Sequence, residues 1–235
     1  MFNDSCIQDF RNHAEASYPN ECCGLVVQNM SGFHYFPCVN IAINPSEEFA
    51  ISPDSYLNAQ RVGSVVSIAH SHPNGPVGAS MADIASCNKS GLPWVILSFP
   101  DLALSTIHPS NQANRPYTGR QFIFGIDDCY SIIQDYYNRE LGIKLDDYYR
   151  EDNFWKSGKN YYMDRFEAQG FRRVSEPQKH DLILMQLSSD VPNHGAIYLG
   201  DDTILHHVSR RLSSTAEYSG YWKRITRIVI RHRDL

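Results

Sequence analysis

The chain has 235 residues, of which 42% are hydrophobic and 12% aromatic, and its formal net charge is −5. This length allows one large domain or two small ones, and the composition is that of a protein with packed cores. The acidic balance argues against binding to nucleic acid or to an anionic membrane through bulk charge. The N-terminus lacks the basic and apolar segments of a signal peptide, and no apolar run reaches the ~18 residues of a spanning helix.

Six cysteines are scattered along the chain, and two of them, Cys22 and Cys23, are adjacent. Neighbouring cysteines bridge only with strain, so a disulfide framework is not expected. In the absence of an export signal we expect reduced thiols in a cytoplasm, with one or more serving a chemical purpose.

The first half of the chain mixes helical and strand patterns. Apolar residues spaced for one helix face precede Pro19, and continuous apolar runs indicate strands inside a sheet. The predicted helices cover residues 5–16 and 80–88, and the predicted strands cover 23–28, 34–43, 65–72 and 94–99. This pattern predicts a mixed α/β domain over residues 1–107.

Periodicity disappears after Thr106, where a polar, proline-containing stretch predicts a linker at residues 108–119. A second domain, residues 120–235, then begins with a long amphipathic helix that ends before Gly142. This helix is predicted over 128–141, followed by strands at 181–187, 194–199, 203–208 and 224–230. The second half is therefore strand-rich, and the two halves look like unrelated modules.

Two histidines, His70 and His72, stand at the end of a predicted strand. Residues i and i+2 of a strand project from one face, so both imidazoles can reach one metal ion. The next predicted helix can return the carboxylate of Asp83 to the same point. Two histidines, a carboxylate and an open fourth position are typical of a catalytic zinc site. Such a site also needs a general base, and Glu21, just before a strand, is the best-placed candidate.

Each of these elements has a structural alternative, because His-x-His on a strand is often surface decoration and Ser-x-x-Asp is by itself a capping box. Their order is more specific. A glutamate, then His-x-His-Pro, then Ser-x-x-Asp resembles the JAMM (Mov34/MPN) metalloprotease family, an α/β/α fold whose members commonly cleave isopeptide-type amide bonds. The resemblance implies Zn²⁺ ligands His70, His72 and Asp83, an acid/base Glu21, and an oxyanion donor Ser80.

A second group of residues indicates cysteine chemistry. Cys129 lies at the start of the long helix, where unpaired N–H groups and the helix dipole favour a thiolate. His194 opens a predicted strand, and a turn at residues 200–202 would place His194 and His206 on one face. A loop one residue longer or shorter would favour His207 instead. Taken singly, the cysteine could be a buried helix residue and the histidines hairpin surface.

The order of these residues resembles the NlpC/P60 cysteine peptidase family, which has a papain-like α+β fold. The matching features are Asp-Cys at a helix start, His-Gly-Ala-Ile-Tyr-Leu-Gly-Asp, and a histidine after that run. The resemblance implies Cys129 as nucleophile, His194 as base and His206, not His207, as orienting residue. The family typically cuts amide bonds of bacterial cell-wall peptides. One difference is Phe122, where the family usually has a tyrosine.

A JAMM domain followed by an NlpC/P60 domain in so short a chain resembles the tail-tip assembly protein K family of long-tailed phages. Specific likenesses are the run that holds Phe124 and Cys129, and the run from Asp152 through Phe171. The resemblance implies synthesis in the bacterial host cytoplasm, association with the virion tail tip, other tail-tip proteins as partners, and peptidoglycan peptides as substrate.

Two hypotheses follow. In the first, the protein is a peptidoglycan endopeptidase with an additional zinc peptidase site. In the second, it is chiefly an assembly factor whose surfaces matter more than turnover. Two complete sets of catalytic residues favour the first hypothesis, and the second domain argues against a cellular deubiquitinase-like enzyme.

Overall fold

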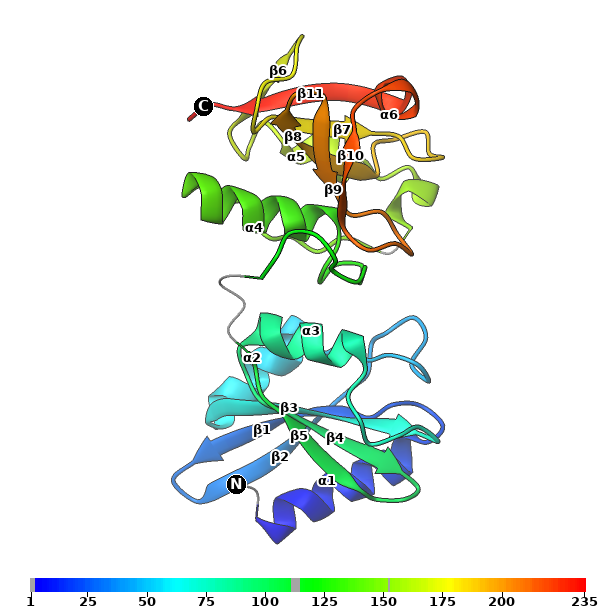
Figure 1. Ribbon diagram of the computed structural model, residues 1–235. Helices are drawn as coiled ribbons and strands as arrows, with labels where there is room; N and C mark the ends of the chain where they lie inside the picture. Colours follow the sequence, from blue (N-terminus) through cyan, green and yellow to red (C-terminus); the bar gives the residue numbers. More distant parts are fainter. Residues whose placement is uncertain (1–2, 111–114, 152) are drawn as a thin grey trace. The chain divides into compact units, whose positions relative to one another are not determined.

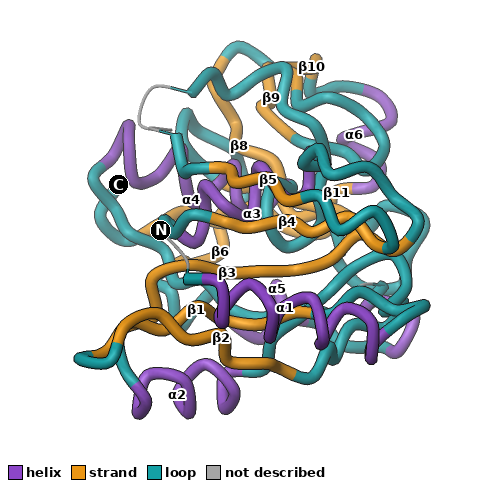
Figure 2. The backbone as a smooth tube through the Cα atoms, turned by 90° about the horizontal axis from the view of Figure 1, so that it is seen from below, coloured by secondary structure: helices purple, strands orange, loops and turns teal. Residues whose placement is uncertain are grey.

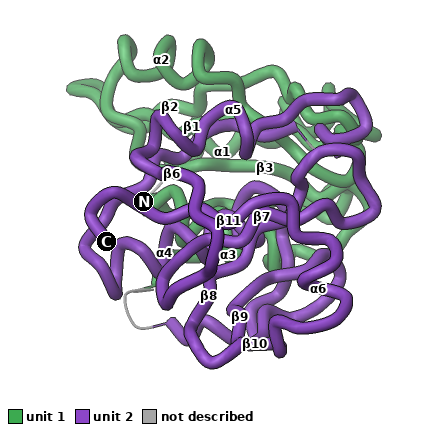
Figure 3. Tube along the Cα trace, turned by 90° about the horizontal axis from the view of Figure 1, so that it is seen from above, with its two compact units in different colours: residues 1–113 green, residues 114–235 purple. Residues whose placement is uncertain are grey.

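The computed structural model describes residues 3–110, 115–151 and 153–235, which fold into two compact units, Met1–Ala113 and Asn114–Leu235 (Figure 3). Each unit has its own sheet and its own buried cores (Figure 1). The predicted linker, residues 108–119, contains residues 111–114, which lie outside the described part, as does Asp152.

In the first unit, helices lie between strands along the chain. The elements are α1 (Asp4–Ser17), β1 (Cys23–Asn29), β2 (Gly32–Cys38), α2 (Pro53–Val62), β3 (Ser64–Pro73), α3 (Met81–Ser90), β4 (Trp94–Phe99) and β5 (Leu104–Ile107). Within the described residues the strands form one five-stranded sheet in the order β2-β1-β3-β4-β5. Only the β3–β4 pair of this sheet is parallel.

Helices cover both faces of this sheet, as the side-chain alternation of its strands requires. Phe10 and Ala14 of α1 pack on one face, against residues such as Val26 (Figure 2). Ala59 of α2 packs on the opposite face with Leu25. The first unit is therefore an α/β/α sandwich, and the predicted layer arrangement is confirmed.

The second unit begins with a helix and ends in strands. Its elements are α4 (Cys129–Leu141), the 3₁₀ helix η1 (Phe154–Ser157), α5 (Tyr161–Arg165), β6 (Phe171–Val174), β7 (Leu182–Met185), β8 (His194–Gly200), β9 (Thr203–His206), β10 (Ser214–Glu217), α6 (Gly220–Ile225) and β11 (Thr226–His232). The described strands form an antiparallel sheet in the order β10-β9-β8-β7-β11-β6.

The main core of the second unit lies between α4 and one face of this sheet. Ile132, Ile133 and Tyr137 of α4 are almost fully buried there, together with Leu184 and Ile197 from the strands. This is the α+β arrangement expected from the sequence. None of the helices in the described residues is long and apolar enough to cross a membrane.

Some predicted boundaries are wrong, and each has a local cause. The strand predicted at 34–43 ends at Cys38, because the Asn40 side chain then organises a loop, accepting from the amides of Ala42 and Ala50. The strand predicted from Arg224 begins at Thr226, after α6.

The sequence patterns also missed several short elements. The helix α2 has clear start signals in hindsight: Ser52 caps it through the amide of Ser55, and Pro53 is its first residue. The remaining missed elements are β5, η1, α5, β6, β10 and α6, all of six residues or fewer.

Candidate metal centre and thiol site

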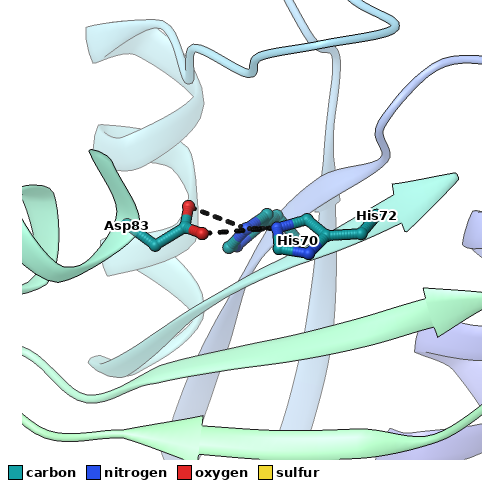
Figure 4. Close-up of side chains that lie close together, drawn as sticks. All are labelled: His70, His72 and Asp83. Carbon is teal, nitrogen blue, oxygen red and sulfur yellow. Dashed lines mark hydrogen bonds and ion pairs between the residues drawn. The ribbon is translucent and has the colours of Figure 1, made fainter. Parts of the chain in front are cut away.

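Strand β3 and helix α3 bring the three predicted metal ligands together (Figure 4). His70 Nε2 lies 3.0 Å from His72 Nε2 and 3.1 Å from Asp83 Oδ1, and His72 Nε2 lies 3.3 Å from Asp83 Oδ2. One potential ligand atom from each residue therefore lies within 4.8 Å of the others. Two imidazole nitrogens and a carboxylate at this separation suit a tetrahedral zinc site with an open position.

The protonation of these groups depends on their mutual contacts. Burial alone would raise the pKa of Asp83, but its hydrogen bonds with His70 and His72 outweigh burial and hold the pKa well below its usual range. The hydrogen bond to Asp83 raises the pKa of His72. Burial lowers the pKa of His70, which is 0% exposed. The carboxylate is thus fixed as an anion that faces two imidazoles.

The two imidazoles differ in what surrounds them apart from Asp83. His72 Nδ1 lies 2.8 Å from the carbonyl oxygen of Pro76, so it donates there and its Nε2 is turned toward Asp83 and His70. His70 is instead clamped between rings, stacked on Phe49 at 4.6 Å and edge-on to Trp94 at 5.5 Å. Its Nδ1 is buried without a hydrogen-bond partner among the described residues.

Glu21 lies two residues before the start of β1, and it is only 8% exposed. Burial raises its pKa to about 7, an increase that the charge of His72 opposes and that of Asp83 supports. The amide of the next residue, Cys22, donates to Ser71 Oγ at 2.9 Å, which ties this end of β1 to the strand segment between the two histidines. A carboxyl with a pKa near neutrality is suited to exchange protons at pH 7.

Ser80 has a structural role that the sequence patterns had offered as the alternative. It is the N-cap of α3: its Oγ accepts from the Asp83 amide at 3.1 Å, and its own amide donates to Asp83 Oδ2 at 2.7 Å. This capping box orients the Asp83 carboxylate toward the histidines. The proposed oxyanion contact of Ser80 stays a prediction.

In the second unit, Cys129 is the first residue of α4. The N-cap residue Asp128 accepts hydrogen bonds from the amides of Tyr130 and Ser131. Arg150 Nη2 contacts Asp128 Oδ2 at 2.8 Å, and its guanidinium lies 4.7 Å from the centre of the Tyr130 ring. The amides at this helix end are therefore already used by a carboxylate, which is in turn neutralised by an arginine.

Strand β8, which begins at His194, passes beside this helix end, where the backbone of Gly195 hydrogen-bonds Cys129. Within the β8–β9 hairpin, Ala196 pairs with His206, so His194 and His206 project from the same face. His194 Nε2 lies 3.2 Å from His206 Nδ1. His207 instead projects to the other side, where its ring meets Phe122 edge-on at 5.1 Å.

Gly195 allows this strand to approach α4 closely. A Cβ added at Gly195 would lie 2.9 Å from Ile133 Cδ1, which is closer than carbon atoms tolerate. Ile133 is one helical turn after Cys129, so the two side chains share a face of α4. The absence of a side chain at position 195 therefore permits β8 to pass close to α4 at this point.

The thiol itself is buried and protonated. Its Sγ lies 3.3 Å from Tyr162 Oη, and Cys129 is 6% exposed. Burial raises its pKa to about 11, and the charge of Asp128 adds to this, whereas burial lowers the pKa of His194 to about 3. The expected thiolate at the helix N-terminus is therefore wrong for this state, because desolvation dominates and Asp128 already occupies the helix amides. Thiol and imidazole are thus both neutral.

Two members of this site were not predicted from the sequence, Arg150 and Tyr162. Both come from the aromatic-rich segment between α4 and β6, where the sequence gives no periodicity to place them. The sequence offered only a compositional signal for them, namely tyrosines clustered near an arginine. In the structure the rings of Tyr130 and Tyr148 pack against the guanidinium of Arg150.

Comparison with known proteins agrees with this two-part organisation. Residues 3–106 match the family of prokaryotic homologs of the JAB domain, and residues 118–231 match the NlpC/P60 family. A solution structure of a protein from Desulfitobacterium hafniense is similar at 23% identity and a TM-score of 0.38, covering 44% of this chain and 78% of that one.

Two curated relatives are similar over most of their length. Tail tip assembly protein K of Escherichia phage N15 is 38% identical over 95% of this chain and 92% of its own. Tail tip assembly protein K of Escherichia phage lambda is 39% identical over 78% of this chain and 89% of its own. The chain therefore belongs to the tail tip assembly protein K family, with a JAB-type domain followed by an NlpC/P60 domain.

Proposed function

We propose that the protein is a phage tail-tip hydrolase whose second unit cleaves peptide amide bonds of peptidoglycan. The observation that carries this proposal is the hydrogen bond between His194 Nε2 and His206 Nδ1. His194 belongs to β8, and the next residue of this strand, Gly195, contacts Cys129 at the start of α4. With Nε2 engaged, Nδ1 of His194 is the ring nitrogen left to take the thiol proton. Cys129 would then be the nucleophile, His194 the base and His206 the orienting residue, as in cysteine peptidases.

The reaction starts from a neutral pair. As Cys129 Sγ attacks the substrate carbonyl carbon, its proton passes to His194, and His206 holds the imidazole in position. The resulting oxyanion collapses, the C–N bond breaks, and His194 returns the proton to the leaving amine. Water then attacks the thioester with His194 as base, which releases the acid product and restores the thiol.

For the first unit we propose a zinc-dependent peptidase site. His70, His72 and Asp83 would hold the ion, and zinc in such a site supplies a Lewis acid that makes water nucleophilic at neutral pH. Glu21 would accept and return protons, for which a pKa of about 7 is suitable. Ser80 would donate to the developing oxyanion. One equivalent of zinc in the purified protein, lost in His70→Ala, would support this assignment.

Purified muropeptides test the main proposal. Wild-type protein should release free amines, and Cys129→Ala should release none, while Cys87→Ala, a buried cysteine of the first unit, should behave as wild type. Absence of cleavage by wild-type protein together with full infectivity of phage that carry Cys129→Ala would refute the peptidase function.

The second candidate is an assembly factor with little turnover, which the names of both relatives favour. Its partners would be other tail-tip proteins, met in the host cytoplasm. Phage that carry Cys129→Ala or His70→Ala separate the two functions. If the variants form complete tails but the phage cannot infect, the protein acts as an enzyme. If deletion of the whole protein prevents tail formation while phage with either variant are normal, the protein acts in assembly alone.

A further inference from the structure

We propose that Tyr162 is a catalytic residue of the thiol site, which donates a hydrogen bond to Cys129 Sγ as negative charge develops there. The proposal rests on the proposed cysteine peptidase function. It adds a group from α5 to a site otherwise built by α4, β8 and β9.

The contact is direct and enclosed. Tyr162 Oη lies 3.3 Å from Cys129 Sγ, well within the range of a hydrogen bond to sulfur. Both residues are buried, Tyr162 at 5% and Cys129 at 6% exposed, so water competes little for either atom. The ring is fixed by neighbours: its centre lies 6.1 Å from those of Tyr130 and Phe154.

The positions of the protons determine the direction of this hydrogen bond during the proposed reaction. In the neutral state either group can donate, but once the thiol proton has passed to His194 only the hydroxyl has a hydrogen to give. A hydrogen bond to an anion is stronger than one to a neutral thiol, so the contact favours the charged form. Burial raises the pKa of Tyr162 well above its usual value, and therefore the tyrosine donates without losing its proton.

Among the described residues, Tyr162 supplies the one side-chain hydroxyl that hydrogen-bonds Cys129 Sγ. Phe122, on the segment that precedes α4, has no hydroxyl, and its ring packs against His207. The positive charge of Arg150 acts in the same direction as Tyr162 on the thiol, but its Nη2 is engaged with Asp128. Tyr162 is therefore the hydroxyl that hydrogen-bonds the sulfur, in addition to the backbone of Gly195.

The test is the alkylation rate of Cys129 by iodoacetamide in the full chain, measured from pH 7 to 9.5. The tryptic peptide 121–139 contains Cys129 as its only cysteine, so mass spectrometry isolates its rate from those of the other thiols. Tyr162→Phe keeps the ring and removes the hydroxyl. Tyr161→Phe, the neighbouring residue of α5, is the matched control.

We expect Tyr162→Phe to slow alkylation of Cys129 about threefold to tenfold at each pH, because less thiolate forms. Tyr161→Phe should leave the rate unchanged. If the substitution instead loosened the packing around Cys129, the alkylation rate would rise, because iodoacetamide would reach the thiol more easily. An equal or faster rate in Tyr162→Phe would overturn the proposal.

The same variants distinguish this inference from the proposed function. If muropeptides are cleaved, Tyr162→Phe should lower kcat and leave KM nearly unchanged. If wild-type protein cleaves nothing, the peptidase function fails, while a slower alkylation in Tyr162→Phe still establishes the donor role at the sulfur.

Discussion

The two candidate sites are built on opposite electrostatic plans. In the first unit, His70, His72 and Asp83 direct lone pairs at one point, and the carboxylate is held ionised there. In the second unit, Cys129 and His194 are both buried and both neutral. In the first site an ionised carboxylate faces two imidazoles, an arrangement that a cation bound between them would stabilise. In the second site neither group carries a charge.

The difference teaches how burial serves each chemistry. Around the first site, burial of His70 and Glu21 disfavours protonated imidazole and ionised glutamate, which leaves a nitrogen ligand and a proton-carrying base. Around the second site, burial raises the pKa of the Cys129 thiol and lowers that of the His194 imidazole, which disfavours the charged form of each. Four predictions separate the two sites.

The largest effect should come from the base of the thiol site. His194→Ala removes the acceptor of the Cys129 proton, so we expect muropeptide cleavage to fall by about a thousandfold or more. Zinc content should not change. His108→Ala, an exposed histidine of the first unit, is the control. A variant that retains more than a tenth of the activity would exclude His194 as base.

The converse change is Asp83→Asn, which replaces the ionised ligand by a neutral amide. We expect zinc affinity, measured by competition with a chelator, to fall by about a hundredfold, because a charged ligand is lost. Cleavage of muropeptides should be unaffected. Asp54→Asn, in the first turn of α2, is the matched control. Unchanged affinity in Asp83→Asn would remove this residue from the metal centre.

A smaller effect concerns stability of the metal-free first unit. Folding raises the pKa of Glu21 from 4.5 to about 7, so its contribution to stability is present below pH 4.5 and is lost as pH rises through 7. Glu21→Gln avoids the cost of ionisation, and we expect it to stabilise this unit by about 2 kcal/mol at pH 8.

Denaturant unfolding with chelator present, at pH 5 and pH 8, measures this effect. At pH 5 the Glu21→Gln variant and wild type should differ by much less. Glu15→Gln, an exposed residue of α1, should show no pH-dependent difference. If Glu21→Gln is less stable than wild type at pH 8, then ionisation of the buried Glu21 carboxyl does not destabilise the first unit, which would contradict this prediction.

The smallest effect should follow from Gly195→Ala. The added Cβ would lie 2.9 Å from Ile133 Cδ1, so the buried Ile133 side chain must move, at a cost of about 1–2 kcal/mol to the second unit. Cleavage should fall, and Ile133→Val should partly restore it by removing the crowded methyl group. Gly78→Ala, where an added Cβ meets nothing within 4 Å, serves as control. Full activity in Gly195→Ala would show that close packing here is dispensable.

The sequence predicted the parts of both sites that depend on local spacing. His70 and His72 are two residues apart on a strand, and the hairpin register places His194 and His206 on one face. Both relations follow from the two-residue period of strands.

What could not be predicted depends on long-range packing. Tyr162 reaches Cys129 from 33 residues away, through a segment without periodicity. The protonated state of the thiol was also out of reach, because helix position predicts one sign and burial, known only from the fold, imposes the other.

The enclosure of Cys129 has a consequence for the durability of the protein. The thiolate is the form of cysteine that attacks peroxides and disulfides, so a cysteine held as a thiol is slow to become sulfenic acid. With Cys129 6% exposed and its pKa near 11, oxidants meet neither an accessible nor an ionised sulfur. We therefore expect this thiol to resist oxidation in aerobic surroundings.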